Sequence, residues 1–336
     1  MQKKKRSRYV KQTIQILIRV IIPVVLFFCI PVFCMPVAGF GTQPPQQSPY
    51  REAVRIGTIA DGSINEVSGL AASYRDKDLL WMINDSGHPP VLYGVSRSGV
   101  KRAVFKIEDA VNTDWEDMSL FRYQGESYLL IADVGDNLAQ RQSCTLYIIR
   151  EPDRLRFQTD RPLPLKIVSR IRFNYENGPR DCEAVAVDIK NKQVLLLSKR
   201  ESPPALYQLP LKMDEPRTRY TARRIAPLTT IPKPTPSDLK KKYGKYRSQP
   251  TSMDLSPDST TLIILTYKHA YYFKQDRSHA WKEIFKTFPR EIKLPHPDSG
   301  ELRQRETICI HPQTGELIVT SEGRFAPIYS LQPKGL

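Results

Sequence analysis

Three carboxylates surround a tryptophan in the segment NTDWEDMSLF, residues 112 to 121, where Asp114, Glu116 and Asp117 stand within four positions. Acidic residues are poor strand formers, yet they precede an alternating apolar stretch that is typical of a β-strand. Carboxylates in such a group are suited to general-base chemistry or to binding a hard cation such as Ca²⁺. The elements that would place these acids must therefore be identified.

The segment that begins at Glu116 is one of five related segments. Each begins with Glu or Thr and alternates thereafter, and 16 to 18 residues further on a second strand-like run ends in a polar residue. A third run in every unit carries a tyrosine. Such regular self-similarity indicates a repeat architecture. The leading segments are EVSGLAAS (66–73), EDMSLF (116–121), EAVAVD (183–188), TSMDLSP (251–257) and ETICIHP (306–312).

These repeats predict an all-β chain, a five-bladed β-propeller. The fifth unit runs out of chain after its third strand, and AVRIGTI (53–59) is a strand with nothing to pair with before the first unit. This N-terminal strand is predicted to close the ring as the missing outer strand. Six blades are the alternative, for which two intervals of 67 and 68 residues leave barely enough room. Fourth strands are expected at 101–107, 166–173, 219–226 and 281–287.

In an antiparallel blade, the start of the first strand and the end of the second lie at the same edge. The leading acids and the polar strand ends are therefore expected to gather around one mouth of the central channel. Blades two and three repeat a pair of acids two residues apart, Asp114 with Glu116 and Asp181 with Glu183. The residues predicted to hold a metal there are Glu66, Asn84, Asp85, Asp114, Asp133, Asp136, Asp181, Glu306 and Glu322.

Carboxylates that converge in this way raise one another's pKa values unless positive charge lies among them. One source is a calcium ion, which takes six to eight oxygen ligands, and VGDN (134–137) offers such oxygens on a glycine-bearing turn. The other source is the protein itself, through Lys199, Arg200 and neighbouring bases. With these bases, the acids would serve only to fasten blade to blade.

The residues that precede the predicted propeller have the pattern of a targeting segment. Residues 1 to 12 carry six Lys or Arg and no acid, and Val20–Phe33 is an apolar run too short for a comfortable membrane span. We therefore expect a signal peptide or N-terminal anchor at 1–39, a linker at 40–52 and the propeller at 53–331. The chain is predicted to be exported, periplasmic or secreted.

Positive charge in the rest of the chain is local. Residues 217 to 247 hold ten Lys or Arg against one acid, Asp238, while the whole chain has a formal net charge of +16. This basic insertion, 217–250, is expected to be a loop on the mouth side that recruits an anionic small molecule or an envelope component. A protein partner at the channel mouth is the alternative, whereas nucleic acid is not expected and the chain is predicted to be a monomer.

Several enzyme classes are excluded because their motifs are absent. The sequence has no G-x-S-x-G elbow, no H-E-x-x-H zinc motif and no phosphate-binding P-loop. Three cysteines follow the leader, which is too few for a disulfide scaffold.

Six motifs resemble those of secreted bacterial propellers of the phytase-like or SdiA-regulated type: EVSGLAAS, INDSG, DWEDMSL, ADVGDN, DCEAVAV and TSEG. The resemblance implies calcium among mouth carboxylates and, in some families, hydrolysis of phosphomonoesters or lactones by metal-bound water. Thr251, Lys199 and Tyr267 stand where an acid would complete a fivefold ring. The ligands that the resemblance implies are Glu66, Asn84, Glu116, Asp133, Glu183 and Glu322.

Two functions remain. The first is a binding module whose mouth holds a cation and an anionic ligand or partner. The second is a calcium-dependent hydrolase, with Glu116 or Glu183 as the general base and Lys199 neutralising the charge that develops on the substrate. Because a propeller does not determine its function, the geometry of the mouth must decide between them.

Overall fold

The computed structural model describes residues 47–153, 161–213, 219–275, 279–295 and 304–335. The chain divides between Pro44 and Pro45, and every described strand lies in the unit Pro45–Leu336. The predicted signal peptide or anchor (1–39) and most of the predicted linker (40–52) lie outside the described residues. Among the residues described, no helix is long and apolar enough to cross a membrane.

The described part of Pro45–Leu336 is all-β apart from short helical turns, as the alternating segments predict. The first repeat contains β2 (Val67–Ala72), β3 (Leu79–Asn84), β4 (Val91–Ser96) and β5 (Lys101–Ile107), with β9 (Leu163–Leu165) added parallel to β5. The second contains β6 (Trp115–Tyr123), β7 (Glu126–Asp133), β8 (Cys144–Arg150) and β10 (Ile167–Tyr175). The third contains β11 (Cys182–Asp188), β12 (Gln193–Ser198), β13 (Ala205–Pro210) and β14 (Arg219–Pro227).

The remaining strands form two further sheets. One contains β15 (Pro250–Leu255), β16 (Thr261–Thr266), β17 (Ala270–Lys274) and β18 (Arg290–Ile292). The other contains β19 (Arg305–Ile310), β20 (Leu317–Ser321), β21 (Pro327–Leu331) and, from the start of the unit, β1 (Val54–Thr58). The antiparallel pairing of β1 with β21, with Val54 opposite Ser330, confirms that the N-terminal strand completes the last sheet.

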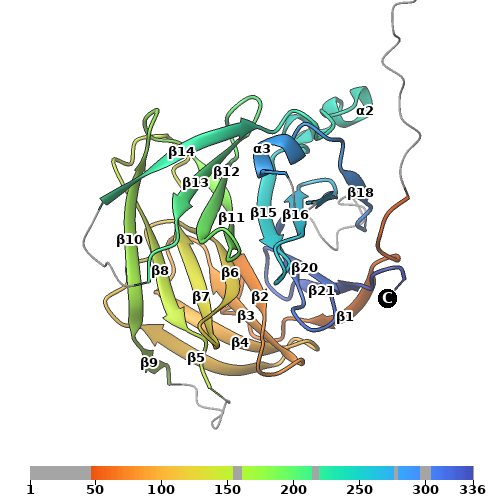
Figure 1. Ribbon diagram of the computed structural model, residues 1–336. Helices are drawn as coiled ribbons and strands as arrows, with labels where there is room; N and C mark the ends of the chain where they lie inside the picture. The colour runs from red at the N-terminus through yellow and green to blue at the C-terminus, as the bar shows by residue number, and fades with distance from the viewer. Residues whose placement is uncertain (1–46, 154–160, 214–218, 276–278, 296–303, 336) are drawn as a thin grey trace, which may run out of the picture. The chain divides into compact units, whose positions relative to one another are not determined.

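The first strand of each repeat packs against the first strand of the next. Strand β2 neighbours β6, β6 neighbours β11, β11 neighbours β15, β15 neighbours β19, and β19 returns to β2. These inner strands surround the centre of the unit in Figure 1. At the rim, β10 and β14 pair in parallel and join two repeats into one eight-stranded sheet. Pro45–Leu336 thus closes its own ring around its own core and is a self-contained folding unit.

One predicted strand is wrong. Residues 281–287 do not form the outer strand of the fourth repeat, because Trp281–Ile284 is the short helix α3 and β18 takes the outer position. Trp281, Ile284 and Phe285 are buried at the three- and four-residue spacing of a helix. The indole N–H of Trp281 also donates to Asp188 Oδ2 over 2.9 Å, which holds the helix against the sheet.

Buried carboxylates fasten the inner strands to one another. Asp117 on β6 accepts hydrogen bonds through Oδ2 from the backbone N–H of Val185 on β11, at 2.8 Å, and of Met253 on β15, at 3.3 Å. Asp254 on β15 likewise accepts from the N–H of Ile310 on β19, at 2.8 Å. Burial raises the pKa of Asp117, and these N–H donors oppose that rise. Acids that lie within the strands therefore contribute to the fastening role predicted for the leading acids.

Replacement of Asp117 by Ala is expected to lower the free energy of unfolding by about 3 kcal/mol or more, because it leaves several buried N–H groups without an acceptor. Ser119 accepts a single inter-strand bond, from the N–H of Val187, so Ser119→Ala is expected to cost about 1 kcal/mol. Denaturant unfolding of both variants measures the difference. Equal losses would show that Asp117 does not tie the inner strands together.

Candidate functional site

Every inner strand carries a β-bulge at the same level. The pairing register with the second strand shifts by one residue in each of the repeats, for example between Trp115 and Asp117. A bulge inserts one residue and redirects its side chain. The inserted residues are Ser68, Glu116, Glu183, Thr251 and Glu306.

This register changes the alignment of the first repeat. The sequence pattern places Glu66 level with Glu116, whereas the structure places Ser68 there. The side chain of Glu66 is about half exposed, and its carboxylate lies 3.4 Å from His88 Nδ1. The hydroxyl of Ser68 is buried and has no hydrogen-bond partner among the described residues.

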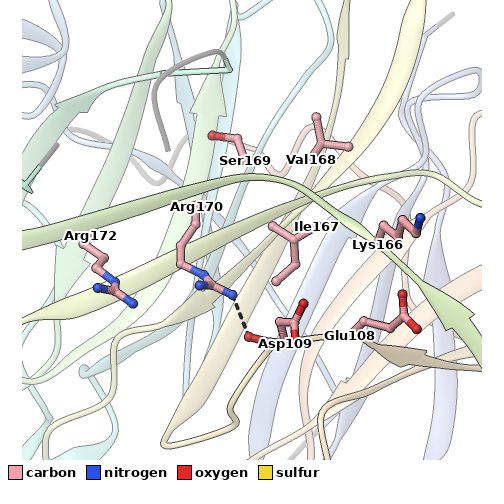
Figure 2. A pocket seen from close by; sticks show the side chains of 8 residues that line it. All are labelled: Glu108, Asp109, Lys166, Ile167, Val168, Ser169, Arg170 and Arg172. Carbon is pink, nitrogen blue, oxygen red and sulfur yellow. Dashed lines mark hydrogen bonds between the residues drawn. The ribbon is translucent and has the colours of Figure 1, made fainter. Parts of the chain in front are cut away.

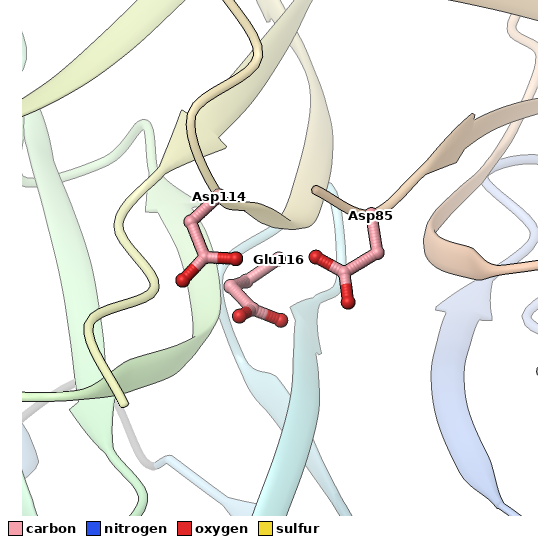
Figure 3. A group of neighbouring side chains, drawn as sticks. All are labelled: Asp85, Asp114 and Glu116. Carbon is pink, nitrogen blue, oxygen red and sulfur yellow. The ribbon is translucent and has the colours of Figure 1, made fainter. Parts of the chain in front are cut away.

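Three carboxylates from different elements meet beside the bulge of β6. Asp85 follows the end of β3, Asp114 immediately precedes β6, and Glu116 is the bulged residue. One oxygen from each lies within 4.8 Å of the others, and Figure 3 shows the three side chains gathered at the same place. Glu116 is buried and the other two are partly buried. Such a set can hold a hard cation.

The pKa values of these carboxylates are raised, as expected where too little positive charge lies among them. Burial raises the pKa of Glu116 well above its usual value, and the carboxylates of Glu183, Asp85 and Asp114 raise it further. Burial, Asp85 and Glu183 together raise the pKa of Asp114 to about 7. The group therefore resists carrying its full negative charge at neutral pH.

Glu183 joins the group from the next inner strand. Its carboxylate lies 2.7 Å from the Lys199 ammonium, and both side chains are almost fully buried. Burial raises the pKa of Glu183, whereas Lys199 and a hydrogen bond with Glu116 act to lower it. Oxygens of Glu116, Asp181 and Glu183 form a second set within 4.8 Å of one another. The two sets share Glu116, which makes it the centre of the site.

Lys199 is the cation at the centre of these acids. Burial opposes its charge, but the carboxylates of Glu183 and Glu306 raise its pKa. Its ammonium also lies 5.2 Å from the centroid of the Tyr267 ring. Burial raises the pKa of Glu306 well above its usual value, and burial together with Asp85 and Glu66 raises that of Glu322 to about 7. We call the assembled set the acidic mouth: Asp85, Asp114, Glu116, Glu183, Glu306 and Glu322.

Three other predicted ligands already have protein partners. Asp133 pairs with Arg141 at 2.6 Å. Asp136 accepts a hydrogen bond from the N–H of Arg141 at 2.8 Å and donates its own N–H to Asp181 at 2.9 Å. Asp181 also pairs with Arg200 at 2.6 Å. These acids hold the loops that follow β7 and precede β11, and Asp181 does so while lying within 4.8 Å of Glu116 and Glu183.

Asn84 is held in the same manner. Its amide nitrogen donates to the carbonyl of Ser63 over 2.8 Å, and its oxygen accepts from the N–H of Glu66 over 3.4 Å. The side chain is buried and ties the loop before β2 to the end of β3. Its oxygen thus accepts one long hydrogen bond from the protein.

Gly135 contributes to the site through the side chain that it lacks. A Cβ at this position would overlap Glu116 Oε1 and would lie 2.5 Å from Asp114 Oδ2. Only glycine lets the backbone of the loop after β7 approach both carboxylates. The turn VGDN (134–137) was noticed in the sequence for its oxygens, but nothing in the pattern revealed this close approach.

Residues 219–227 of the predicted basic insertion, 217–250, are not a loop but strand β14, which carries Arg219, Arg223 and Arg224. The loop follows that strand. It contains α2 (Pro236–Leu239) and the 3-10 turn η1 (Gly244–Tyr246), and Thr235 caps α2. The buried Asp238 pairs with Lys268, at 2.7 Å, in the turn that also contains Tyr267. The insertion is thus fixed next to the residues that surround Lys199.

Comparisons with known proteins leave the function open. No family model matches the chain, and no curated protein matches it. Among solved structures, the PQQ-bound form of aldose sugar dehydrogenase from Streptomyces coelicolor is similar at a TM-score of 0.42 and 11% identity, over 87% of this chain and 99% of that one. Hydrazine synthase of Kuenenia stuttgartiensis is similar at 0.41 and 9%, over 80% and 72%. Similarities of this size assign neither cofactor nor reaction to the chain.

The raised pKa values of Asp114 and Glu322, both about 7, predict a pH dependence of stability in the absence of divalent cations. The folded state binds protons that the unfolded chain, with carboxyl pKa values near about 4, has released. Their contribution to stability is complete below about pH 4 and is lost as the pH rises through 7. The unfolding midpoint in EDTA should therefore fall between about pH 5 and about pH 8.

The double variant Asp114→Asn/Glu322→Gln provides the control for this pH profile. Neither replacement titrates, so the fall in midpoint across the same range should become shallower. An unchanged profile would show that these two carboxyls do not carry the raised pKa values.

Proposed function

We propose that the chain is an exported five-bladed β-propeller whose acidic mouth binds a hard cation, with calcium the best fit, together with an anionic ligand. The observation that carries the proposal is the set of Asp85, Asp114 and Glu116, whose oxygens lie within 4.8 Å of one another. The closed succession of inner strands from β2 to β19 supports a count of five blades. The basic head and apolar run within residues 1–39 support export.

Calcium is the cation proposed for this set, because its coordination geometry is the more flexible. Ca²⁺ binds carboxylate oxygens at about 2.3–2.6 Å in flexible geometry, so opposite ligands lie up to about 5 Å apart. Mg²⁺ requires near-ideal octahedral geometry at about 2.0–2.1 Å. A bound cation would also offset the repulsion that raises the pKa values of Asp114 and Glu116.

An anionic ligand fits the remaining charge. The protein supplies only part of the six to eight oxygens that calcium takes, so a phosphate or carboxylate group can complete the shell. The Lys199 ammonium, paired with Glu183 at 2.7 Å, adds a second point of attraction. A capture module of this kind needs no catalytic residue.

Calcium-dependent hydrolysis is the second candidate, and one contact favours it. Glu183 stands beside the set formed by Asp85, Asp114 and Glu116 without belonging to it, and it shares a hydrogen bond with Glu116. A carboxylate in that position can act as a general base toward a water that the cation polarises. Lys199 would then neutralise charge on the phosphoryl or lactone oxygen.

Calcium is expected to stabilise Pro45–Leu336 by about 2.7 kcal/mol at a 100-fold excess over its dissociation constant. Glu116→Gln and Asp114→Asn each remove a ligand, so both should abolish most of the rise in midpoint relative to EDTA. Gly135→Ala should weaken it as well, because the added Cβ displaces both carboxylates. Thermal unfolding with and without Ca²⁺ measures the effect.

Glu52→Gln is the matched control, since Glu52 is exposed and lies outside the acidic mouth. It should respond to calcium as the wild type does. If the wild type gains no stability from Ca²⁺, or if Glu116→Gln gains as much as the wild type, the cation proposal is wrong.

Hydrolysis is tested with a phosphomonoester and a lactone under the same conditions. If the second candidate is correct, turnover requires calcium, and Glu183→Gln lowers it by about 100-fold or more while the calcium-induced rise in midpoint remains. If neither substrate is turned over while calcium still binds, the acidic mouth is a capture site and not a hydrolase.

A further inference from the structure

Away from the acidic mouth, the outer strands of two repeats present arginines side by side. Strands β10 and β14 run parallel, and Arg172 on β10 pairs in register with Arg219 on β14. Side chains at paired positions of a parallel ladder share a face, and the strands are about 4.8 Å apart. Arg170, two residues earlier on β10, lies on the same face.

A groove opens along this face. Its volume is about 650 Å³, and its basic wall is formed by Lys166, Arg170 and Arg172 of β10 and the residue before it. The opposite wall is the turn after β5, with Glu108 and Asp109. Figure 2 shows the guanidinium groups of Arg170 and Arg172 extending from β10 in the same direction, with Arg170 reaching Asp109.

Arg170 is held in place before any ligand arrives. Its Nη2 donates to the backbone carbonyl of Asp109 over 2.6 Å, and its guanidinium carbon lies 5.4 Å from the centroid of the Tyr147 ring. Its Nε is buried and has no hydrogen-bond partner among the described residues. A guanidinium fixed in this manner loses little rotamer freedom when an anion binds.

The neighbouring arginines are placed at a cost to the free protein. Arg172 and Arg219 are exposed, and neither forms an ion pair with the residues that the structure describes. Like charges directly opposite each other across a sheet are destabilising. The pairing of β10 with β14 joins two repeats. Repulsion between Arg172 and Arg219 therefore opposes a contact that holds these repeats together.

We propose that the β10–β14 face, with the groove at its edge, binds a linear polyanion. The Cα atoms of residues two apart on β10 are separated by about 7 Å, and those of paired residues on β10 and β14 by about 5 Å, so the face presents a row of positive charges to negative groups that repeat along a chain. Guanidinium groups bind both phosphate and carboxylate through paired hydrogen bonds. The ligand is a polyphosphate or an acidic oligosaccharide, both of which present this chemistry.

The test measures binding of inorganic tripolyphosphate and of trigalacturonate to Pro45–Leu336 by calorimetry in EDTA, which removes cations from the acidic mouth. The wild type should bind at least one probe, more weakly as salt is added. Arg172→Gln/Arg219→Gln should lower that affinity at least tenfold, and Glu108→Gln should raise it by removing a repelling charge. Which probe binds distinguishes the phosphate from the carboxylate source.

Lys190→Gln/Lys192→Gln is the matched control, because it removes two exposed positive charges away from the groove. It should leave the affinity within about twofold. Without ligand, Arg172→Gln/Arg219→Gln should also unfold at a higher temperature than the wild type, since it relieves repulsion between the strands; a structural role for these arginines would give the opposite shift.

Three results would overturn the proposal. They are no binding of either probe to the wild type at low salt, an equal loss of affinity in the lysine control, and a lower unfolding midpoint in the arginine variant. None of these results depends on calcium, so the cation proposal for the acidic mouth stands or falls separately.

Discussion

The convergence of carboxylates where the inner strands meet is the constraint on which the rest of the site depends. Glu116, Glu183 and Glu306 all occupy β-bulges that lie at one level around the centre. Each is buried, and each has a raised pKa because burial and neighbouring acids disfavour its charge. Lys199 supplies part of the positive charge that these acids lack, through its ion pair with Glu183. In the surrounding loops, Arg141 pairs with Asp133 and Arg200 with Asp181.

Two adjacent residues at the start of β6 have different surroundings. Glu116 is bulged toward other acids, whereas Asp117 beside it accepts hydrogen bonds from two other inner strands. Three carboxylates at the start of β6 are therefore compatible with a stable strand, because one is satisfied by backbone donors. The remaining two, Asp114 and Glu116, lie among other carboxylates and have raised pKa values.

Much of the fold could be predicted from the sequence, since alternation and spacing report strands directly. The polar ends of the second strands and the closing β1 follow from that pattern. The bulges do not, because an inserted residue leaves no periodic signal, and so Glu66 was aligned where Ser68 lies. The sequence pattern also could not separate the acids held by arginine, such as Asp133, from those that remain together in the acidic mouth.

The closing pair of strands has a consequence for how the protein is made. Val54 pairs with Ser330, so the contact that completes the ring joins segments from opposite ends of the unit. Contacts of such long sequence separation form late, because the chain between them must be ordered first. During synthesis β1 must wait, unpaired, until β21 has emerged. The ring can therefore be completed only after nearly the whole unit has been synthesised.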